Sequence, residues 1–383
     1  MIIKHRQTKM LSKYLLAPLM LAMGLTMFQS VRAADSYQFG VLFPLTGPNA
    51  TYGDVFSKGV DLAVKMVNKS GELDHPIEAN YVDSQALPQH AVVGMNKLVH
   101  VDEVPYVLTA FSGVSKAIAP IGNRFHVIMV NGGGVSPELA IGDYFLNVIP
   151  LADQETKALL PYVVKKHNLE RLAVIHVNDP FGNSVRDAVN TVCGDLSCEV
   201  VSDLSVNPDT SSFQAEVAKI RAAKPDAVFV ASYGQQQNVM VKQLRDGGVD
   251  AQILSYSGFG IPTTLALKEA QGAIFDNQQL ALDVNDLSKE FRKRYLEDNS
   301  DDPNFFVANY ANAVFIYAEL IDRLEKQSRD VTGENLLDTL HSGLGFDIIG
   351  GEMTFNDDGT VTIPIAINMI EDGKAIPQTV VNP

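Results

Sequence analysis

Residues 111–138 have the sequence FSGVSKAIAPIGNRFHVIMVNGGGVSPE. Two turns built from small residues, at 111–115 and 131–136, each follow an apolar run and precede a helical pattern. A strand that leads into a helix leaves backbone N–H groups free beside the positive end of the helix dipole, and glycine lets a bound molecule approach the backbone closely. The stretch therefore predicts alternating strands and helices, with the two turns forming one wall of a site for a small anion or carbonyl.

The same alternation extends in both directions from this stretch. Short apolar runs that end at turns lie at 39–45, 77–82, 104–108, 127–130 and 145–149, and after Pro150 at 171–176, 199–204, 227–231 and 253–255. Apolar strands separated by amphipathic helices indicate parallel sheets covered on both faces. The restart after Pro150 predicts an α/β protein of two doubly wound lobes with parallel-sheet cores. Ligands of such sheets bind at the carboxyl ends of the strands, where both turns lie.

From Leu280 onward, helical patterns come first and strands follow. The helical patterns lie at 287–297, 305–326 and 333–341. The turn Asn356-Asp357-Asp358-Gly359 then separates an apolar run from an alternating strand at 361–370, which is typical of a β-hairpin.

The N-terminus has the pattern of a cleaved secretory signal peptide. Four basic residues precede an apolar run at 14–28, and Val31-Arg32-Ala33 fits the small-residue rule for cleavage. We expect residues 1–33 to be removed and the protein to reach the periplasm. Five of the 30 basic residues and none of the 45 acidic ones lie in this segment, so the remaining chain carries 25 basic and 45 acidic side chains, a net charge of −20. Such a surface disfavours nucleic acid and anionic membranes.

The chain contains two cysteines, Cys193 and Cys198. In an oxidising compartment this spacing predicts a local disulfide that pins a turn between a helix and a strand. No histidine lies near them, so a metal site is not expected. The sequence also lacks a Walker motif, G-x-G-x-x-G, G-x-S-x-G and H-E-x-x-H, and no two of the eight histidines have helical metal spacing. We expect no cofactor and no metal, and we do not expect an enzyme.

Five stretches in this order resemble the type I periplasmic solute-binding proteins of ABC importers, in the leucine, isoleucine and valine branch. They are Phe43-Pro44-Leu45-Thr46-Gly47 with Tyr52-Gly53, the run from Phe111 to Pro120, Ser136-Pro137-Glu138-Leu139, Asn178-Asp179-Pro180-Phe181-Gly182, and Phe355-Asn356-Asp357-Asp358-Gly359. The resemblance implies two lobes joined by three crossovers that close on a small molecule. It also implies an N-terminal lobe made of 34–149 plus 281–346 and a C-terminal lobe made of 150–280 plus 347–383.

The resemblance further implies which residues bind the ligand. Ser and Thr groups with backbone N–H of the first lobe take the ligand carboxylate in the amino-acid-binding members, and an acid of the second lobe pairs with the ammonium. The expected ligand-binding residues are Ser112, Ser115, Gly133, Gly134, Tyr52, Phe181, Tyr233 and Ser257. Phe181 and Tyr233 are expected to pack on an apolar part of the ligand.

Two positions depart from the family pattern. Val135 stands where the second turn usually supplies a hydroxyl, and Ser257 stands where the ammonium-pairing acid is expected. Because a buried ammonium without a counter-ion costs several kcal/mol, an amino-acid ligand requires another acid, for which Asp276 and Asp179 are the candidates. A small carboxylic acid or a neutral amide is the competing ligand class.

The resulting interpretation is a monomeric periplasmic binding protein that captures an amino acid or related small organic carboxylate by lobe closure. It would present this ligand to the membrane permease of an ABC importer. An alternative is a sensor that presents a small carboxylate or amide to a membrane receptor. A secreted enzyme is a third class, and turnover of the ligand on incubation distinguishes it from the other two.

Overall fold

The computed structural model describes residues 36–196, 198–342 and 345–382. Ser36–Pro383 form one compact unit, which holds two separate main sheets. The predicted signal peptide at 1–33 lies outside the described residues. In the part of the chain that is described, no helix has the length and apolarity to cross a membrane.

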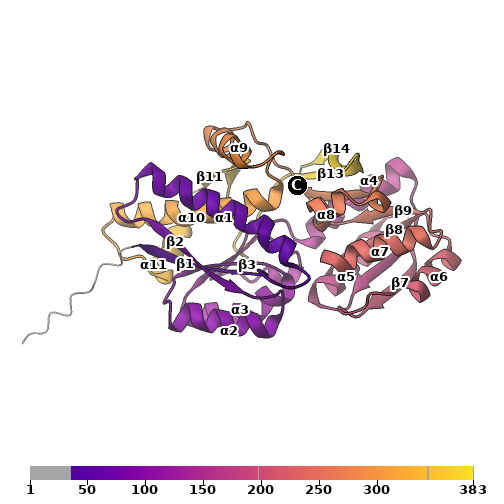
Figure 1. Ribbon diagram of the computed structural model, residues 1–383, viewed down its shortest axis with the longest axis horizontal. Coiled ribbons are helices and arrows are strands. Elements are labelled where there is room, and N and C mark those ends of the chain that lie inside the picture. The colour runs from indigo at the N-terminus through magenta and orange to yellow at the C-terminus, as the bar shows by residue number, and fades with distance from the viewer. Residues whose placement is uncertain (1–35, 197, 343–344, 383) are drawn as a thin grey trace, which may run out of the picture. The chain divides into compact units, whose positions relative to one another are not determined.

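The first sheet has the strand order β2-β1-β3-β4-β5, and all its neighbouring strands are parallel. Its strands are β1 (Tyr37–Phe43), β2 (Ile77–Asp83), β3 (Tyr106–Thr109), β4 (Ile128–Asn131) and β5 (Phe145–Asn147). Helices cover both of its faces: α1 (Ala50–Ser70) and α10 (Phe305–Lys326) on one, and α2 (Pro88–His100) and α3 (Ser112–Phe125) on the other (Figure 1). The helices α9 (Asp286–Asp298) and α11 (Gly333–Leu340) also pack on this lobe.

The close packing of α1 on α10 depends on a glycine. A Cβ atom at Gly59 would lie 2.1 Å from the backbone oxygen of Val307, so only glycine allows this helix crossing. The remaining contact is apolar, and it includes the rings of Phe56 and Tyr310, whose centroids are 4.6 Å apart. Because α10 comes some 240 residues after α1 in the chain, the first lobe is completed only when the chain returns to it.

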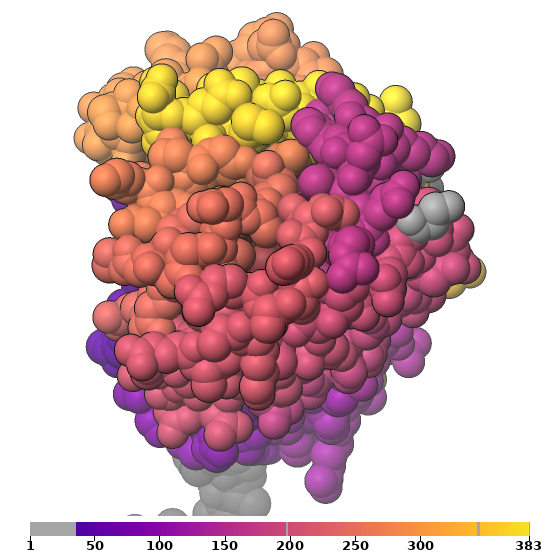
Figure 2. Space-filling model, turned by 90° about the vertical axis from the view of Figure 1, so that its right-hand side faces the viewer, coloured from indigo at the N-terminus to yellow at the C-terminus, as the bar shows by residue number. Residues whose placement is uncertain are grey.

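The second sheet has the order β14-β13-β10-β9-β8-β6-β7. Its strands are β6 (Arg171–Val177), β7 (Glu199–Val206), β8 (Ala227–Ala231), β9 (Gln252–Ser255), β10 (Ile274–Gln278), β13 (Ile365–Glu371) and β14 (Lys374–Val381). The first five of these are parallel, and β13 and β14 add an antiparallel edge. The space-filling view shows these last strands in yellow, beside the magenta segment that contains α4 (Ala152–His167) (Figure 2).

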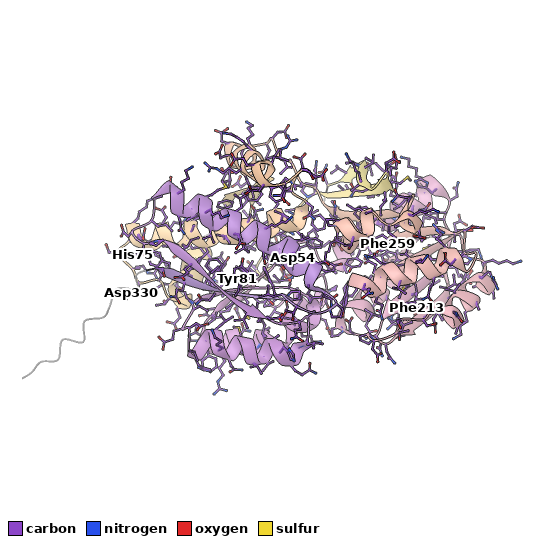
Figure 3. The ribbon with its side chains drawn as sticks, in the orientation of Figure 1. Asp54, His75, Tyr81, Phe213, Phe259 and Asp330 are labelled. Atoms are coloured by element: carbon purple, nitrogen blue, oxygen red, sulfur yellow. A yellow bond between two sulfur atoms is a disulfide. The ribbon has the colours of Figure 1, made fainter. Side chains whose placement is uncertain are left out.

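Helices also cover the second sheet. They are α4, α5 (Pro180–Asp195), α6 (Gln214–Ala223) and α7 (Gly234–Asp246), with the short helices η2 (Ser257–Gly260), α8 (Pro262–Leu265) and η3 (Lys268–Ala270) after β9. Phe213 and Phe259 are fully buried in this lobe (Figure 3). The predicted disulfide is present between Cys193, near the end of α5, and Cys198, just before β7. This prediction is confirmed.

The predicted fold class is confirmed, and the chain passes between the lobes three times. The passages run from β5 to α4, from β10 to α9, and from the small hairpin of β11 (Phe346–Ile348) and β12 (Gly351–Met353) to β13. Strand β11 contacts α9 and α10. The lobe boundaries proposed from the sequence, 34–149 plus 281–346 and 150–280 plus 347–383, stay a prediction.

Candidate functional site

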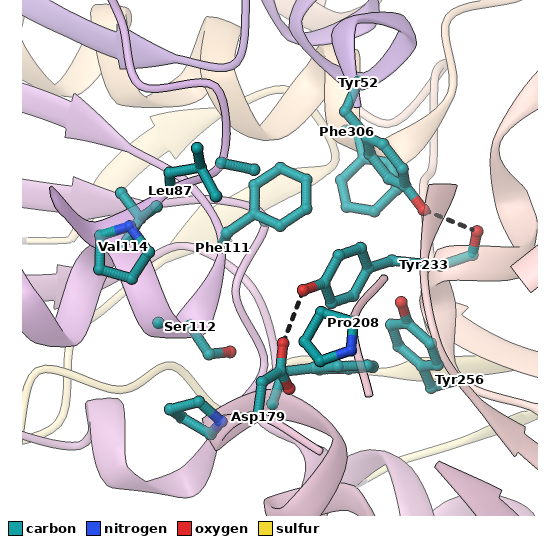
Figure 4. Close-up of a pocket in the computed structure, with 17 residues that line it drawn as sticks. Tyr52, Leu87, Phe111, Ser112, Val114, Asp179, Pro208, Tyr233, Tyr256 and Phe306 are labelled. Carbon is teal, nitrogen blue, oxygen red and sulfur yellow. Dashed lines mark hydrogen bonds between the residues drawn. The ribbon is translucent and has the colours of Figure 1, made fainter. Parts of the chain in front are cut away.

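A cavity of about 150 Å³ lies where carboxyl ends of strands from both sheets meet. Phe111 and Ser112 follow β3 on the first sheet, and Asp179, Tyr233 and Tyr256 follow β6, β8 and β9 on the second. Figure 4 shows these side chains pointing toward one another around the space. The residues that line it are Tyr52, Ala86, Leu87, Pro88, Phe111, Ser112, Gly113, Val114, Gly133, Asp179, Pro180, Phe181, Pro208, Tyr233, Tyr256, Gly258 and Phe306.

The first-lobe wall is the N-terminus of α3. Ser112, Gly113 and Val114 form the first turn of this helix, and all three line the cavity. The helix has no acidic residue in its first turn and no side-chain hydrogen bond at its N-cap. Unsatisfied N–H groups and the positive end of the helix dipole therefore face the cavity, which is the arrangement that binds carboxylates and other small anions.

Ser112 adds a hydroxyl donor to this wall. Its Oγ accepts a hydrogen bond from the backbone N–H of Ser136, 3.1 Å away, so its own proton remains available to a ligand oxygen. Gly133, from the second small-residue turn, completes the wall. A Cβ atom there would lie 2.9 Å from the hydroxyl oxygen of Tyr310 and 3.0 Å from the ring of Phe56, so a larger residue would push these groups aside.

Aromatic rings form most of the remaining wall. Phe111 lies with its ring centroid 5.4 Å from that of Tyr52 and 5.3 Å from that of Tyr233. On the second lobe the ring of Phe181 lies 5.5 Å from Tyr233 and 4.7 Å from Tyr256. Such a continuous set of rings favours an apolar or aromatic ligand body and leaves little room for water.

Phe111 holds an unusual backbone conformation. It is the N-cap of α3 and has φ of 64° and ψ of 129°. A bulky side chain rarely adopts positive φ, which costs of order 1–3 kcal/mol and is found mostly at ligand sites and switches. This conformation lets one residue end the strand, begin the helix and present its ring to the cavity.

Asp179 is the only charged side chain among the described residues that line the cavity. Its Oδ1 accepts the backbone N–H of Gly182 at 2.8 Å, which caps α5, and its Oδ2 accepts the Tyr233 hydroxyl at 2.6 Å. Burial raises the pKa of the Asp179 carboxyl, while its hydrogen bonds act in the opposite direction. Burial likewise raises the pKa of the Tyr52 phenol to about 12, so this group is neutral at physiological pH.

Five of the eight ligand-binding residues predicted from the sequence line the cavity. These are Tyr52, Ser112, Gly133, Phe181 and Tyr233.

The other three predicted residues lie behind the cavity wall. Ser115 is fully buried, with its Oγ 3.2 Å from that of Thr109. The Gly134 N–H donates to Asn131 Oδ1 at 2.7 Å, and Ser257 is fully buried. Of the two candidate counter-ions, Asp179 lines the cavity and Asp276 does not. A ligand contact by any of these residues stays a prediction.

Three of the lining aromatic residues, Phe111, Tyr256 and Phe306, were not predicted from the sequence. Phe111 and Tyr256 come at or just after the carboxyl ends of β3 and β9, so the rule that placed the site at strand ends also points to them. Phe306 lies in the first turn of α10, on a helix that is distant in sequence from the site. No local signal in the sequence marks it as a pocket residue.

Among the described residues, no group of three or more His, Cys, Asp or Glu side chains is placed to hold a metal ion. The lining of the cavity supplies backbone N–H groups, hydroxyls, aromatic rings and one carboxylate.

Comparison with known proteins agrees with this architecture. A family model described as periplasmic binding protein matches residues 36–375. A Leu/Ile/Val-binding protein homolog of Brucella melitensis is 26% identical over 356 residues, which are 91% of this chain and 95% of the relative. Two solved structures share the fold: a leucine-binding protein from Thermotoga maritima (TM-score 0.83, 19% identity, 90% of this chain and 99% of that one) and a solute-binding protein of R. palustris in complex with benzoate (TM-score 0.82, 17% identity, 91% and 97%).

The chain belongs to the periplasmic binding protein family. The family resemblance inferred from the sequence is thereby confirmed, as is the expectation that the protein is not an enzyme.

Proposed function

We propose that the protein captures an apolar amino acid or a related small organic carboxylate between its lobes and presents it to the membrane permease of an ABC importer. The observation that carries this proposal is the uncapped N-terminus of α3, which faces a cavity whose other walls are mainly aromatic. The ligand carboxylate binds the N–H groups of the first turn of α3 and the Ser112 hydroxyl. The ligand body packs between Phe111 and Phe181.

The second lobe determines whether the ligand carries an amino group. Ser257 carries no charge that could pair with an ammonium group, and its side chain is fully buried. Asp179 supplies the one carboxylate, and each of its oxygens already accepts one hydrogen bond. An ammonium group, where the ligand has one, binds at Asp179, and a ligand without one needs no such contact. The two similar structures named above, one a leucine-binding protein and the other bound to benzoate, exemplify these two ligand classes.

Closure of the lobes brings hydrophilic partners together as well. Ser136 Oγ of the first lobe lies 2.6 Å from Ser184 Oγ of the second, and the Tyr52 hydroxyl donates to the backbone oxygen of Gly258 at 3.5 Å. These contacts hold the cavity shut around a ligand and exclude water from it. We further propose that the protein acts as a monomer in the periplasm after loss of residues 1–33.

Isothermal titration with L-leucine, its deaminated analogue 4-methylpentanoate and benzoate tests the proposal. Micromolar or tighter binding of at least one of the three is the expected result. The same ligand should raise the melting temperature of the protein, because a ligand that binds only the folded state stabilises it by mass action. Absence of binding to all three would contradict the proposal. Binding of leucine alone would show that the amino group is required, and binding of benzoate alone would show that Asp179 serves only as a cap.

A further inference from the structure

Two buried carboxyl groups lie outside the ligand contacts described above, Glu155 in α4 and Asp276 in β10. Each side chain is 1% exposed, and none of their four oxygens has a hydrogen-bond partner among the described residues. Among the described residues, no lysine, arginine or histidine acts on either group. A buried carboxylate without a neutralising cation costs several kcal/mol, so the two groups do not both remain ionised.

The pair lies directly behind the second-lobe wall of the cavity. The Glu155 carboxyl faces the hydroxyl and the backbone N–H of Ser257. Ser257 is fully buried, and its Oγ also lacks a hydrogen-bond partner. Its two neighbours, Tyr256 and Gly258, both line the cavity. A change in the charge of the pair therefore reaches the cavity wall through a single residue, Ser257.

The pair also joins the segments that connect the lobes. Helix α4 begins directly after the first passage between the sheets, and β10 ends directly before the second. Helix α4 packs on β10, on α5 and on β13. Glu155 and Asp276 thus lie between the cavity wall and the first two passages of the chain between the lobes.

Burial is the main influence on the pKa of both carboxyl groups. It raises the pKa of Glu155 to about 8, with a further increase from Asp153 and an opposing effect of Ser257. Burial, and then the charge of Glu155, raise the pKa of Asp276 well above its ordinary value. Tyr256, whose phenol is neutral for the same reason, is the other titratable group that interacts with the pair from the elements packed around it.

We propose that Glu155 and Asp276 are positioning residues of the ligand site, an assignment that rests on the proposed function. They act as a protonated carboxyl pair that holds the turn at 256–258 in place behind the cavity. While protonated, the pair is neutral and can hydrogen-bond within itself and to Ser257. When the pair loses its protons, two negative charges face each other in an apolar interior. The turn then moves away, and Tyr256 and Gly258 move with it.

The sign of the pH effect follows from proton binding. An acid whose pKa is raised on folding stays protonated in the native state at pH values where the unfolded chain has lost that proton. Stability is therefore complete below the ordinary pKa of about 4.5 and falls as the pH rises toward about 8 for Glu155. In this window the unfolding equilibrium constant increases up to tenfold per pH unit for each such carboxyl.

The first test is chemical denaturation of the ligand-free protein between pH 5.5 and 8.5. The variant E155Q/D276N replaces both acids with neutral amides, and E170Q/D283N, at two exposed positions, is the matched control. Over this range the wild-type unfolding constant should increase at least tenfold more than that of E155Q/D276N, while E170Q/D283N follows the wild type. Parallel profiles for wild type and E155Q/D276N would overturn the proposal.

The second test measures affinity for L-leucine and benzoate at pH 7 and pH 9. Wild-type affinity for the probe that binds should fall at least threefold from pH 7 to pH 9, whereas the affinity of E155Q/D276N should change less than twofold between the same two pH values. Unchanged wild-type affinity, or an equal fall in E155Q/D276N, would overturn the positioning role. One equivalent of metal retained by the wild type and lost from E155Q/D276N in elemental analysis would also overturn it. If neither probe binds the wild type, the proposed function fails, but the denaturation profiles still decide whether the pair is protonated.

Discussion

The two walls of the cavity use different chemistry to face the same small space. The first-lobe wall presents hydrogen-bond donors, the backbone N–H groups at the start of α3 and the Ser112 hydroxyl, beside the rings of Tyr52, Phe111 and Phe306. The second-lobe wall carries a carboxylate, Asp179, and the rings of Phe181, Tyr233 and Tyr256. We propose that a ligand carboxylate is oriented toward the first lobe and that the second lobe determines what the rest of the ligand can be.

The largest effect is expected from a negative charge on the first-lobe wall. In S112D an acid would stand where the ligand carboxylate binds, and like charges in a closed site cost several kcal/mol, so affinity for leucine or benzoate should fall at least 100-fold. An acid in the first turn of α3 is compatible with the helix dipole, so the variant should fold with wild-type stability. The measurement is titration calorimetry with a melting curve of the free protein.

Ser212 provides the matched control for this change. It is exposed just before α6, and S212D should bind the same ligand within twofold of the wild type. Retention of full affinity by S112D would show that the carboxylate does not bind at the start of α3.

A smaller effect is expected from the ring that lies between the walls. F111A removes the contacts of Phe111 with Tyr52 and Tyr233, and should weaken binding about tenfold, or about 1.4 kcal/mol, for leucine and benzoate alike. F111G should be about 1 kcal/mol more stable than F111A, because glycine adopts φ of 64° without strain. Calorimetry and urea denaturation measure the two quantities.

The control for F111A is F125A, at an exposed phenylalanine in the last turn of the same helix. It should leave affinity unchanged. If F111A weakened the affinity for only one of the two ligands, the Phe111 ring would contact that ligand class specifically and would not be a general part of the cavity wall.

The carboxylate of the second-lobe wall should matter only for ligands with an amino group. D179N keeps the cap of α5, since asparagine is an equally good N-cap residue, but it removes the charge. Leucine should bind about tenfold more weakly, and benzoate should bind within twofold of the wild type. Equal losses of affinity for both ligands would mean that Asp179 acts only through Tyr233. The control for the loss of one acid is D286N, at an exposed position.

The smallest effect is expected from the contact between the lobes. S184A removes the hydroxyl that lies 2.6 Å from Ser136 Oγ, and a neutral hydrogen bond of this kind contributes about 1 kcal/mol or less. Affinity should therefore fall about two- to fivefold for every ligand, with no change in preference. Small-angle X-ray scattering of S184A and the wild type, with and without ligand, tests whether the open form becomes more populated in the variant. An altered order of ligand preference would contradict a purely mechanical role.

The sequence predicted the first-lobe wall more completely than the second. The turn at 111–115 was identified because a strand end, a small-residue turn and a helix start are all local patterns, and α3 begins there. Phe181 and Tyr233 were predicted from the family resemblance, and both line the cavity. Ser115 in α3 and Ser257 in η2 also follow strand ends, but both side chains are buried and neither lines the cavity, because what packs around a side chain decides its surroundings.

The sequence by itself determined the alternation of strands and helices, the two lobes, the disulfide and the edge of the sheets at which the cavity lies. These follow from periodicity and turn chemistry, which act between residues close together in the chain. Only the tertiary structure decided that Phe306 joins the cavity wall, that Asp179 and not Asp276 supplies its carboxylate, and that Glu155 and Asp276 are both buried. The physical reason is that the cavity wall joins segments up to 254 residues apart, such as Tyr52 and Phe306, whose ring centroids lie 6.1 Å apart, and burial, which shifts the pKa of an acid, exists only once those segments have packed.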